Sequence, residues 1–150
     1  MLDIPVIAVT GGSCAGKSTF MAKAVERCVQ NGFQPRVVPE AATTFMNGGM
    51  EPSSPAFQEN VLRFVLDMEA AFVRDAQTLD NPVILTDRGV LDQNGPYMSH
   101  KDFLALGHKV TGLPEQEFFV RARDERYAGV ICLRSAACGA EEFYDFSSNP

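Results

Sequence analysis

A nine-residue segment near the N-terminus limits the possible folds more than any other part of the sequence. It reads Gly11-Gly12-Ser13-Cys14-Ala15-Gly16-Lys17-Ser18-Thr19 and fits the pattern G-x-x-x-x-G-K-[ST]. An apolar stretch, Ile4 to Val9, precedes it, and the helical pattern that follows stops at Asn31-Gly32. A strand, a glycine-rich loop and a helix in this order are the context of a phosphate-binding loop. We therefore expect a βα unit whose loop binds the phosphates of a nucleotide.

The residue types in this loop have chemical reasons. Gly11 and Gly16 permit backbone conformations that a side chain would hinder, so successive N–H groups can turn toward a bound anion. The helix N-terminus adds partial positive charge. Lys17 is expected to contact the β- and γ-phosphates, and the Ser18 hydroxyl is expected to ligate Mg²⁺. All nine residues are thus candidate contacts of ATP or GTP bound with Mg²⁺.

Composition indicates one globular domain over residues 1–150. The hydrophobic content of 45% is enough for a proper core, and the length is typical of a single domain. The formal net charge of -6 disfavours a nucleic-acid binder, which would normally present a basic face. A nucleotide site remains compatible with this charge because it needs only a few local cations.

The four cysteines predict a reducing environment. They lie at positions 14, 28, 132 and 138, without C-x-x-C or zinc-site spacing. Cys28 and Cys132 fall in apolar patterns that predict buried thiols. Cys14 is expected to serve as a small loop residue, with a reactive thiol as the alternative. No apolar segment reaches transmembrane length and no signal peptide is visible, so we expect a cytoplasmic protein.

Strand and helix patterns alternate along the chain. Strands are predicted over 4–9, 34–39, 83–87 and 129–133. Helices are predicted over 17–31, 41–46, 53–79, 99–110 and 114–127, with a helical turn at 140–144. The first helix should bury an apolar stripe from Phe20 to Val29, and Ser53-Ser54-Pro55 should start the long helix.

This alternation predicts an α/β protein with the three-layer P-loop NTPase fold, a parallel sheet with helices on both faces. Phosphotransferases of this build usually have a further strand and a lid. We therefore expect the fold to be truncated at the C-terminus.

Acidic residues follow two of the predicted strands, where the ligands of parallel sheets bind. Asp87 ends the third strand as a Walker B acid does and is expected to hold Mg²⁺, with a strand-end cap as the alternative. Arg88 is expected to face the phosphates, the alternative being a surface ion pair. Glu40 is a candidate general base or acceptor-orienting residue, although it could instead cap the next helix. Asp92 is a weaker candidate.

Further arginines lie before the last strand. Arg123 and Arg126 share one helical face, where they could close on a triphosphate as a lid or form a solvated surface with neighbouring acids. His100 and His108 have no partner at metal-ligand spacing, so no role is predicted for them.

Several segments in order resemble a known family, the NadR-like AAA domain group of thymidylate-kinase-like P-loop proteins. Besides the loop, the resemblance is carried by Pro39-Glu40, Phe57-Gln58-Glu59-Asn60, Asp87-Arg88-Gly89 and Gly139-Ala140-Glu141-Glu142-Phe143-Tyr144. The resemblance implies a fold shared with small-molecule kinases, whose bacterial members phosphorylate nicotinamide riboside. It also implies kinship with an animal protein described as a guanine-nucleotide and phosphoinositide binder in membrane-protein trafficking.

Two functions follow as expectations. The first is a kinase-like phosphotransferase that moves the γ-phosphoryl of ATP or GTP to a small hydroxyl or phosphate acceptor. The alternative is a regulatory nucleotide-binding module that engages phosphoinositides or protein partners. A Ras-like switch is disfavoured because no N-K-x-D occurs and the glycine in Asp87-Arg88-Gly89-Val90 comes one place early.

Overall fold

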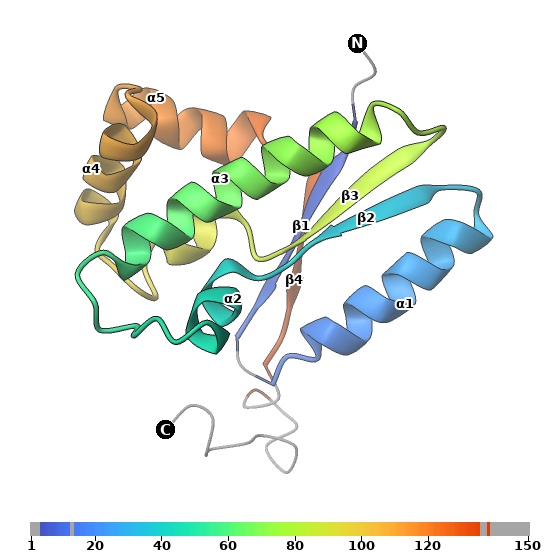
Figure 1. The fold of residues 1–150 in the computed structure, drawn as a ribbon, viewed down its shortest axis with the longest axis horizontal. Helices are drawn as coiled ribbons and strands as arrows, with labels where there is room; N and C mark the ends of the chain where they lie inside the picture. The colour runs from blue at the N-terminus through green and yellow to red at the C-terminus, as the bar shows by residue number, and fades with distance from the viewer. Residues whose placement is uncertain (1–3, 13, 136–137, 139–150) are drawn as a thin grey trace.

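The computed structural model describes residues 4–12, 14–135 and 138, and its centre is a parallel β-sheet (Figure 1). In the described residues the sheet has four strands in the order β2-β3-β1-β4. Their bounds are Val6–Gly11 for β1, Gln34–Val38 for β2, Pro82–Asp87 for β3 and Gly129–Leu133 for β4. All pairings are parallel, so the carboxyl ends of the strands meet at one edge of the sheet.

The strands fit this sheet because their apolar runs suit burial on both faces. β3 lies between β2 and β1 and is buried from Pro82 to Thr86. Ala8 of β1 aligns with Thr86 of β3 and with Val130 of β4. The connection from β1 leads to β2, whereas the connection from β3 leads to β4 on the other side of β1. The chain therefore first adds strands on one side of β1 and then on the other. In such a sheet, ligands usually bind beyond the carboxyl ends of the strands at this switch point.

Helices cover both faces of the sheet, as Figure 1 shows. Helix α1 packs on one face, and α3 lies across the other with α4 and α5 outside it. The α-helices are α1 (Lys17–Gln30), α2 (Ala41–Asn47), α3 (Phe57–Ala76), α4 (His100–Thr111) and α5 (Glu115–Val120). A 3-10 helix, η1 (Val90–Gln93), follows β3, and a π-helix, η2 (Arg121–Glu125), continues α5. The predicted α/β architecture is confirmed.

Three apolar clusters hold these layers together. Met21 of α1 packs with Val9 and Leu85 of the sheet, and Ala76 of α3 packs with Ile84 on the opposite face. The third cluster joins α2, α3, α4 and α5 beyond the sheet edge and includes Phe103, which is fully buried. This helical cluster forms one wall of the site described below.

Some predicted boundaries and burial states were wrong. Helix α3 begins at Phe57, not Ser53, because residues 52–56 form turns and the N-cap residue, Ala56, has no side chain that could cap the helix. Val29 is 60% exposed at the last turn of α1. Cys132 is exposed because β4 is an edge strand on which alternate residues face away from the core. The turn predicted at 140–144 lies outside the described residues. Within the described residues, no helix is both long and apolar enough to span a bilayer.

Candidate functional site

The glycine-rich loop lies at the carboxyl end of β1, with α1 starting directly after it. Gly11 has φ 149°, and a Cβ there would lie 2.6 Å from the carbonyl oxygen of Leu133 in β4. Gly16 is the N-cap residue of α1, with φ 73°. Both positions therefore need glycine, one for close approach of a neighbouring strand and both for the left-handed side of the backbone map. Cys14 is an exposed non-glycine residue with φ 54°, so the loop is tightly curved between them.

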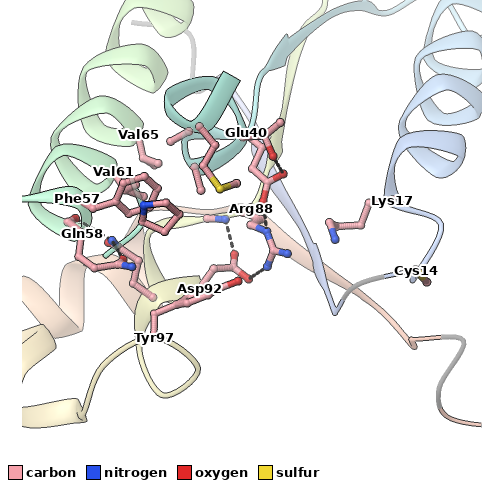
Figure 2. Close-up of a pocket in the computed structure, with 17 residues that line it drawn as sticks. Cys14, Lys17, Glu40, Phe57, Gln58, Val61, Val65, Arg88, Asp92 and Tyr97 are labelled. Atoms are coloured by element: carbon pink, nitrogen blue, oxygen red, sulfur yellow. Dashed lines mark hydrogen bonds and ion pairs between the residues drawn. The ribbon is translucent and has the colours of Figure 1, made fainter. Parts of the chain in front are cut away.

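Lys17 lies in the first turn of α1 and points back along this loop. Its Nζ donates to the carbonyl oxygens of Gly11 and Gly12 at 3.0 and 3.1 Å. Figure 2 shows the amine directed from α1 toward Arg88. Ser18 and Thr19 are exposed in the same turn, and Ser13 lies outside the described residues. The structure thus places a cation beside the loop, and no acidic side chain of the described residues is paired with it.

An ion-pair cluster lies opposite Lys17 and brings together residues from three segments. The Nε of Arg88, just after β3, pairs with Oε1 of Glu40, just after β2. An Nη of Arg88 also lies 3.9 Å from Oδ1 of Asp92 in η1. The side chains of Arg88, Glu40 and Asp92 are 20%, 22% and 15% exposed. Glu40 makes no side-chain cap on α2; its second oxygen accepts from Thr43 at 2.7 Å.

Asp92 contacts more of the site than its weak signal in the sequence indicates. Its Oδ1 accepts from Thr10 at the end of β1, and its Oδ2 accepts from the backbone N–H of Gly89 at 2.5 Å. Asp92 therefore links the loop strand to the turn that carries Arg88. Its place five residues after Asp87 was a weak signal, and the 3-10 helix that redirects it was not predicted.

Asp87 ends β3 next to Val9 of β1. Its Oδ1 is buried, and no described residue donates a hydrogen bond to it. Burial, followed by the nearby Glu40 carboxylate, raises the pKa of Asp87, while Lys17 partly offsets these effects. A buried carboxylate oxygen without a donor is suited to a bound cation. In the described part of the chain, no group of three or more His, Cys, Asp or Glu could hold a metal ion.

A cavity of about 480 Å³ extends from Lys17 past the ion-pair cluster toward α3 (Figure 2). Its charged lining consists of Lys17, Glu40, Arg88 and Asp92. Its other end is mainly apolar and is lined by Ala41, Ala42, Met46, Pro52, Phe57, Val61 and Val65, with Tyr97 at the side. The volume is that of a pocket for a small organic molecule.

Two amide side chains that the sequence did not single out as site residues also line this cavity. Nε2 of Gln93 donates to both the backbone oxygen and Oε1 of Gln58, each at 2.8 Å. Gln58 stands in the first turn of α3 and Gln93 at the end of η1, and Gln93 is only 5% exposed. Their pairing depends on long-range packing, so spacing in the sequence could not have revealed it.

The arginines before β4 lie elsewhere. Arg126 pairs with the buried Glu69 of α3 at 2.6 Å, and Arg123 pairs with its neighbour Asp124 and stands over the ring of Phe119. Neither lines the cavity in the structure. The site is therefore formed by the glycine-rich loop and by the segments that follow β2 and β3.

A family model described as an AAA domain matches residues 6–137, which include the loop, all four strands and the cavity. The chain belongs to this AAA domain family. The AAA domain is a P-loop nucleotide-binding domain, in agreement with the shape of the loop and the position of Lys17. None of the curated proteins matched the chain.

Proposed function

We propose that this AAA domain is a kinase-type phosphotransferase that moves the γ-phosphoryl group of ATP or GTP to a hydroxyl of a small, uncharged acceptor. The observation that carries the proposal is that one cavity joins the Lys17 end of the P-loop to a mainly apolar compartment large enough for a small molecule. Phosphate binding by the loop does not by itself account for that compartment.

The nucleotide end uses the loop and Lys17. Backbone N–H groups between Gly11 and Ser18 would hold the phosphates, and Lys17 would leave the carbonyls of Gly11 and Gly12 to contact them. Mg²⁺ fits this end because Asp87 has a buried oxygen without a donor and Ser18 is exposed in the first turn of α1. When bound, the metal would neutralise the charge of the phosphate oxygens.

The acceptor end uses Glu40 and Arg88. Glu40 lines the cavity and could accept the proton of an acceptor hydroxyl, as a general base does. Arg88 holds Glu40 in place and presents its guanidinium on the cavity side, where it could bind the transferred phosphoryl group. Positioning and charge neutralisation of this kind account for most of the catalysis in phosphoryl transfer.

The amide pair offers a way to recognise the rest of the acceptor. The backbone oxygen of Gln58 can only accept, so the Gln93 atom bonded to it must be Nε2. The Gln58 atom bonded to the same Nε2 must then be Oε1, which leaves Nε2 of Gln58 and Oε1 of Gln93 without a hydrogen-bond partner among the described residues. A neutral donor and a neutral acceptor beside apolar walls suit a planar molecule with adjacent N–H and C=O groups, such as the base of a nucleoside.

Charge balance separates this proposal from the regulatory alternative. The cavity is lined by two cations, Lys17 and Arg88, and by two acids, Glu40 and Asp92. A phosphoinositide headgroup carries several negative charges and would need an excess of cations. We therefore favour a hydroxyl acceptor in this cavity over a phosphoinositide or an acceptor phosphate.

The motif order supports a closer kinship as well. We infer that the chain lies within the NadR-like group, where it resembles the TRPL translocation defect protein. A cytoplasmic location fits Cys28, Cys132 and Cys138, which are free thiols.

The test is a phosphotransfer assay with γ-labelled ATP or GTP, Mg²⁺ and a panel of nucleosides, nucleoside monophosphates and inositol phospholipids. We expect label on a nucleoside-like hydroxyl compound. Glu40→Gln should lower kcat by about 100-fold, within the usual range for loss of a general base, while leaving nucleotide affinity nearly unchanged. Gln58→Ala should chiefly raise the KM of the acceptor by about 10-fold, as expected for loss of one or two hydrogen bonds.

Matched controls are available in the same chain. Glu51→Gln and Gln77→Ala change exposed residues outside the cavity and should leave both constants unchanged. Label on inositol phospholipids alone, or full turnover in Glu40→Gln, would contradict the proposal.

A further inference from the structure

The turn after β3 is held by two consecutive backbone hydrogen bonds to side chains. The N–H of Gly89 donates to Asp92 at 2.5 Å, and the N–H of Val90 donates to the hydroxyl of Tyr127 at 2.8 Å. Between β3 and these two amides, Arg88 has φ 67°, a left-handed conformation that a long side chain rarely adopts. Such a conformation persists when surrounding contacts determine it.

Tyr127 is itself tied to a buried acid. Its hydroxyl donates to Oε1 of Glu69 at 2.9 Å, and the Nε and an Nη of Arg126 lie 2.6 Å from Oε2 of the same carboxylate. Glu69 is 3% exposed, so both its oxygens depend on these partners. We call Glu69, Arg126 and Tyr127 the tyrosine anchor. Burial, followed by the Glu69 carboxylate, raises the pKa of Tyr127, so its hydroxyl stays protonated and can donate and accept at once.

The local backbone is adapted to this anchor. A Cβ at Gly89 would lie 3.1 Å from ring atoms and from the hydroxyl of Tyr127, which is tighter than most such contacts. The π-helix η2 ends immediately before Arg126, and a π-turn shifts the residues that follow it relative to an α-helical course. Two adjacent residues, Arg126 and Tyr127, thereby reach the same carboxylate. None of the three anchor residues lines the cavity.

We propose that Tyr127, fixed by Glu69 and Arg126, is a positioning residue that holds the Arg88–Val90 turn so that Arg88 faces Glu40 and the cavity. This proposal rests on the proposed function for its catalytic consequence, but its structural part stands by itself. The anchor acts from outside the cavity: Asp92, which lines the cavity, accepts from one amide, and Tyr127, bonded to Glu69 of α3, accepts from the next. Loss of the hydrogen bond from the Val90 N–H to Tyr127 would allow Arg88 to leave its left-handed conformation.

The experiment compares the whole chain with Tyr127→Phe, which keeps the ring beside Gly89 and removes only the hydroxyl. Hydrogen exchange of the Val90 amide, followed by NMR, should become at least about 10-fold faster after correction for any change in global stability. Turnover of Mg²⁺–ATP with the acceptor found in the phosphotransfer assay should show kcat lowered by about 10-fold and the KM for ATP within about twofold, because the P-loop keeps its contacts.

Two further variants make the result decisive. Met21→Ala, in the apolar cluster between α1 and the sheet that does not include Val90, controls for general loss of stability and should leave Val90 exchange unaltered after the same correction. Glu69→Gln keeps an acceptor for the Tyr127 hydroxyl but loses the charge that binds Arg126, so it should give a smaller change of the same kind. It also allows the measurement if Tyr127→Phe fails to fold.

Unchanged Val90 exchange in both Tyr127→Phe and Glu69→Gln would overturn the anchor. Faster exchange with an unaltered kcat in an active enzyme would overturn its positioning role. Exchange needs no turnover, so an inactive wild-type chain would count against the proposed function alone, and the exchange result would still decide on the anchor.

Discussion

At the residue scale, the buried carboxylate of Asp87 destabilises the free protein and is suited to bind a cation. Its buried oxygen has no donor in the described residues, and its pKa is raised by burial and by the Glu40 carboxylate. The folded chain therefore holds the Asp87 proton to higher pH than the unfolded chain does. Stability falls as pH rises from the ordinary pKa of aspartate to the raised value, and the cost remains at neutral pH. A bound cation would remove this cost, which links the stability of the free protein to metal binding.

Asp87→Asn tests this link. Without ligands at pH 7, the variant should melt about 2–4 °C higher than the wild type, the shift expected for about 1 kcal/mol in a chain of this size. The gain should vanish near pH 3, where the wild-type carboxyl is also protonated. Calorimetric titration should show that nucleotide affinity no longer depends on Mg²⁺. Asp80→Asn, at an exposed position before β3, should alter neither property. Wild-type Mg²⁺ dependence in Asp87→Asn would rule out Asp87 as the metal acid.

At the element scale, the contact between α4 and α5 shows how close packing can override helix propensity. Gly107 is buried in the middle of α4, and a Cβ there would lie 2.1 Å from ring atoms of Phe118 in α5. Alanine is ordinarily the better helix former by about 1 kcal/mol. Here the added methyl group would have to push Phe118 out of the cluster that forms the apolar wall of the cavity.

Gly107→Ala should therefore lower the free energy of unfolding by about 1–3 kcal/mol, the usual cost of overpacking, when measured in urea. Lys101→Ala, on an exposed position of α4, provides the control and should change it by less than about 0.5 kcal/mol. An increase near 1 kcal/mol in Gly107→Ala would mean that helix propensity prevails and that the close contact with Phe118 is absent in solution.

Elements were predictable from the sequence where local pattern determines them. The strand ending at Asp87 and the helix starting at Lys17 were confirmed because apolar runs and a glycine-rich loop are local signals. The start of α3 was not, since Ser53-Ser54-Pro55 would also suit turns and the helix begins only at Phe57. The π-helix η2 and the exposure of Cys132 depend on contacts between distant segments and on strand order. The same holds for the Gln58–Gln93 pair and for the several contacts of Asp92.

At the scale of the whole molecule, the order β2-β3-β1-β4 determines where the site lies. The glycine-rich loop follows β1, which lies between β3 and β4, so the segment after β3 comes directly beside it. That neighbour carries Asp87 and Arg88, while β2 adds Glu40 from one strand further away. The positions of Glu40, Asp87 and Arg88 at the ends of strands were predictable from the sequence, and their proposed roles stay predictions. Their partners became clear only from the strand order.

The central claim is that the loop from Gly11 to Thr19, with Lys17, holds nucleotide phosphates. Its most direct measurement is the melting temperature with and without Mg²⁺–ATP or Mg²⁺–GTP, in the wild type and in Lys17→Ala. At a nucleotide concentration 100 times the Kd, the wild type should gain about 5–10 °C, from about 2.7 kcal/mol of linked stabilisation. Loss of the ammonium group should weaken triphosphate binding by about 10–100-fold and reduce the gain accordingly. Lys23→Ala, on an exposed position of the same helix, should retain the full gain.

Adenosine and guanosine complete the measurement because they lack phosphates, and any gain they give should be the same in the wild type and in Lys17→Ala. The account predicts a triphosphate-specific gain that depends on Lys17. No gain with either triphosphate in the folded wild type, or an equal gain in Lys17→Ala, would contradict it.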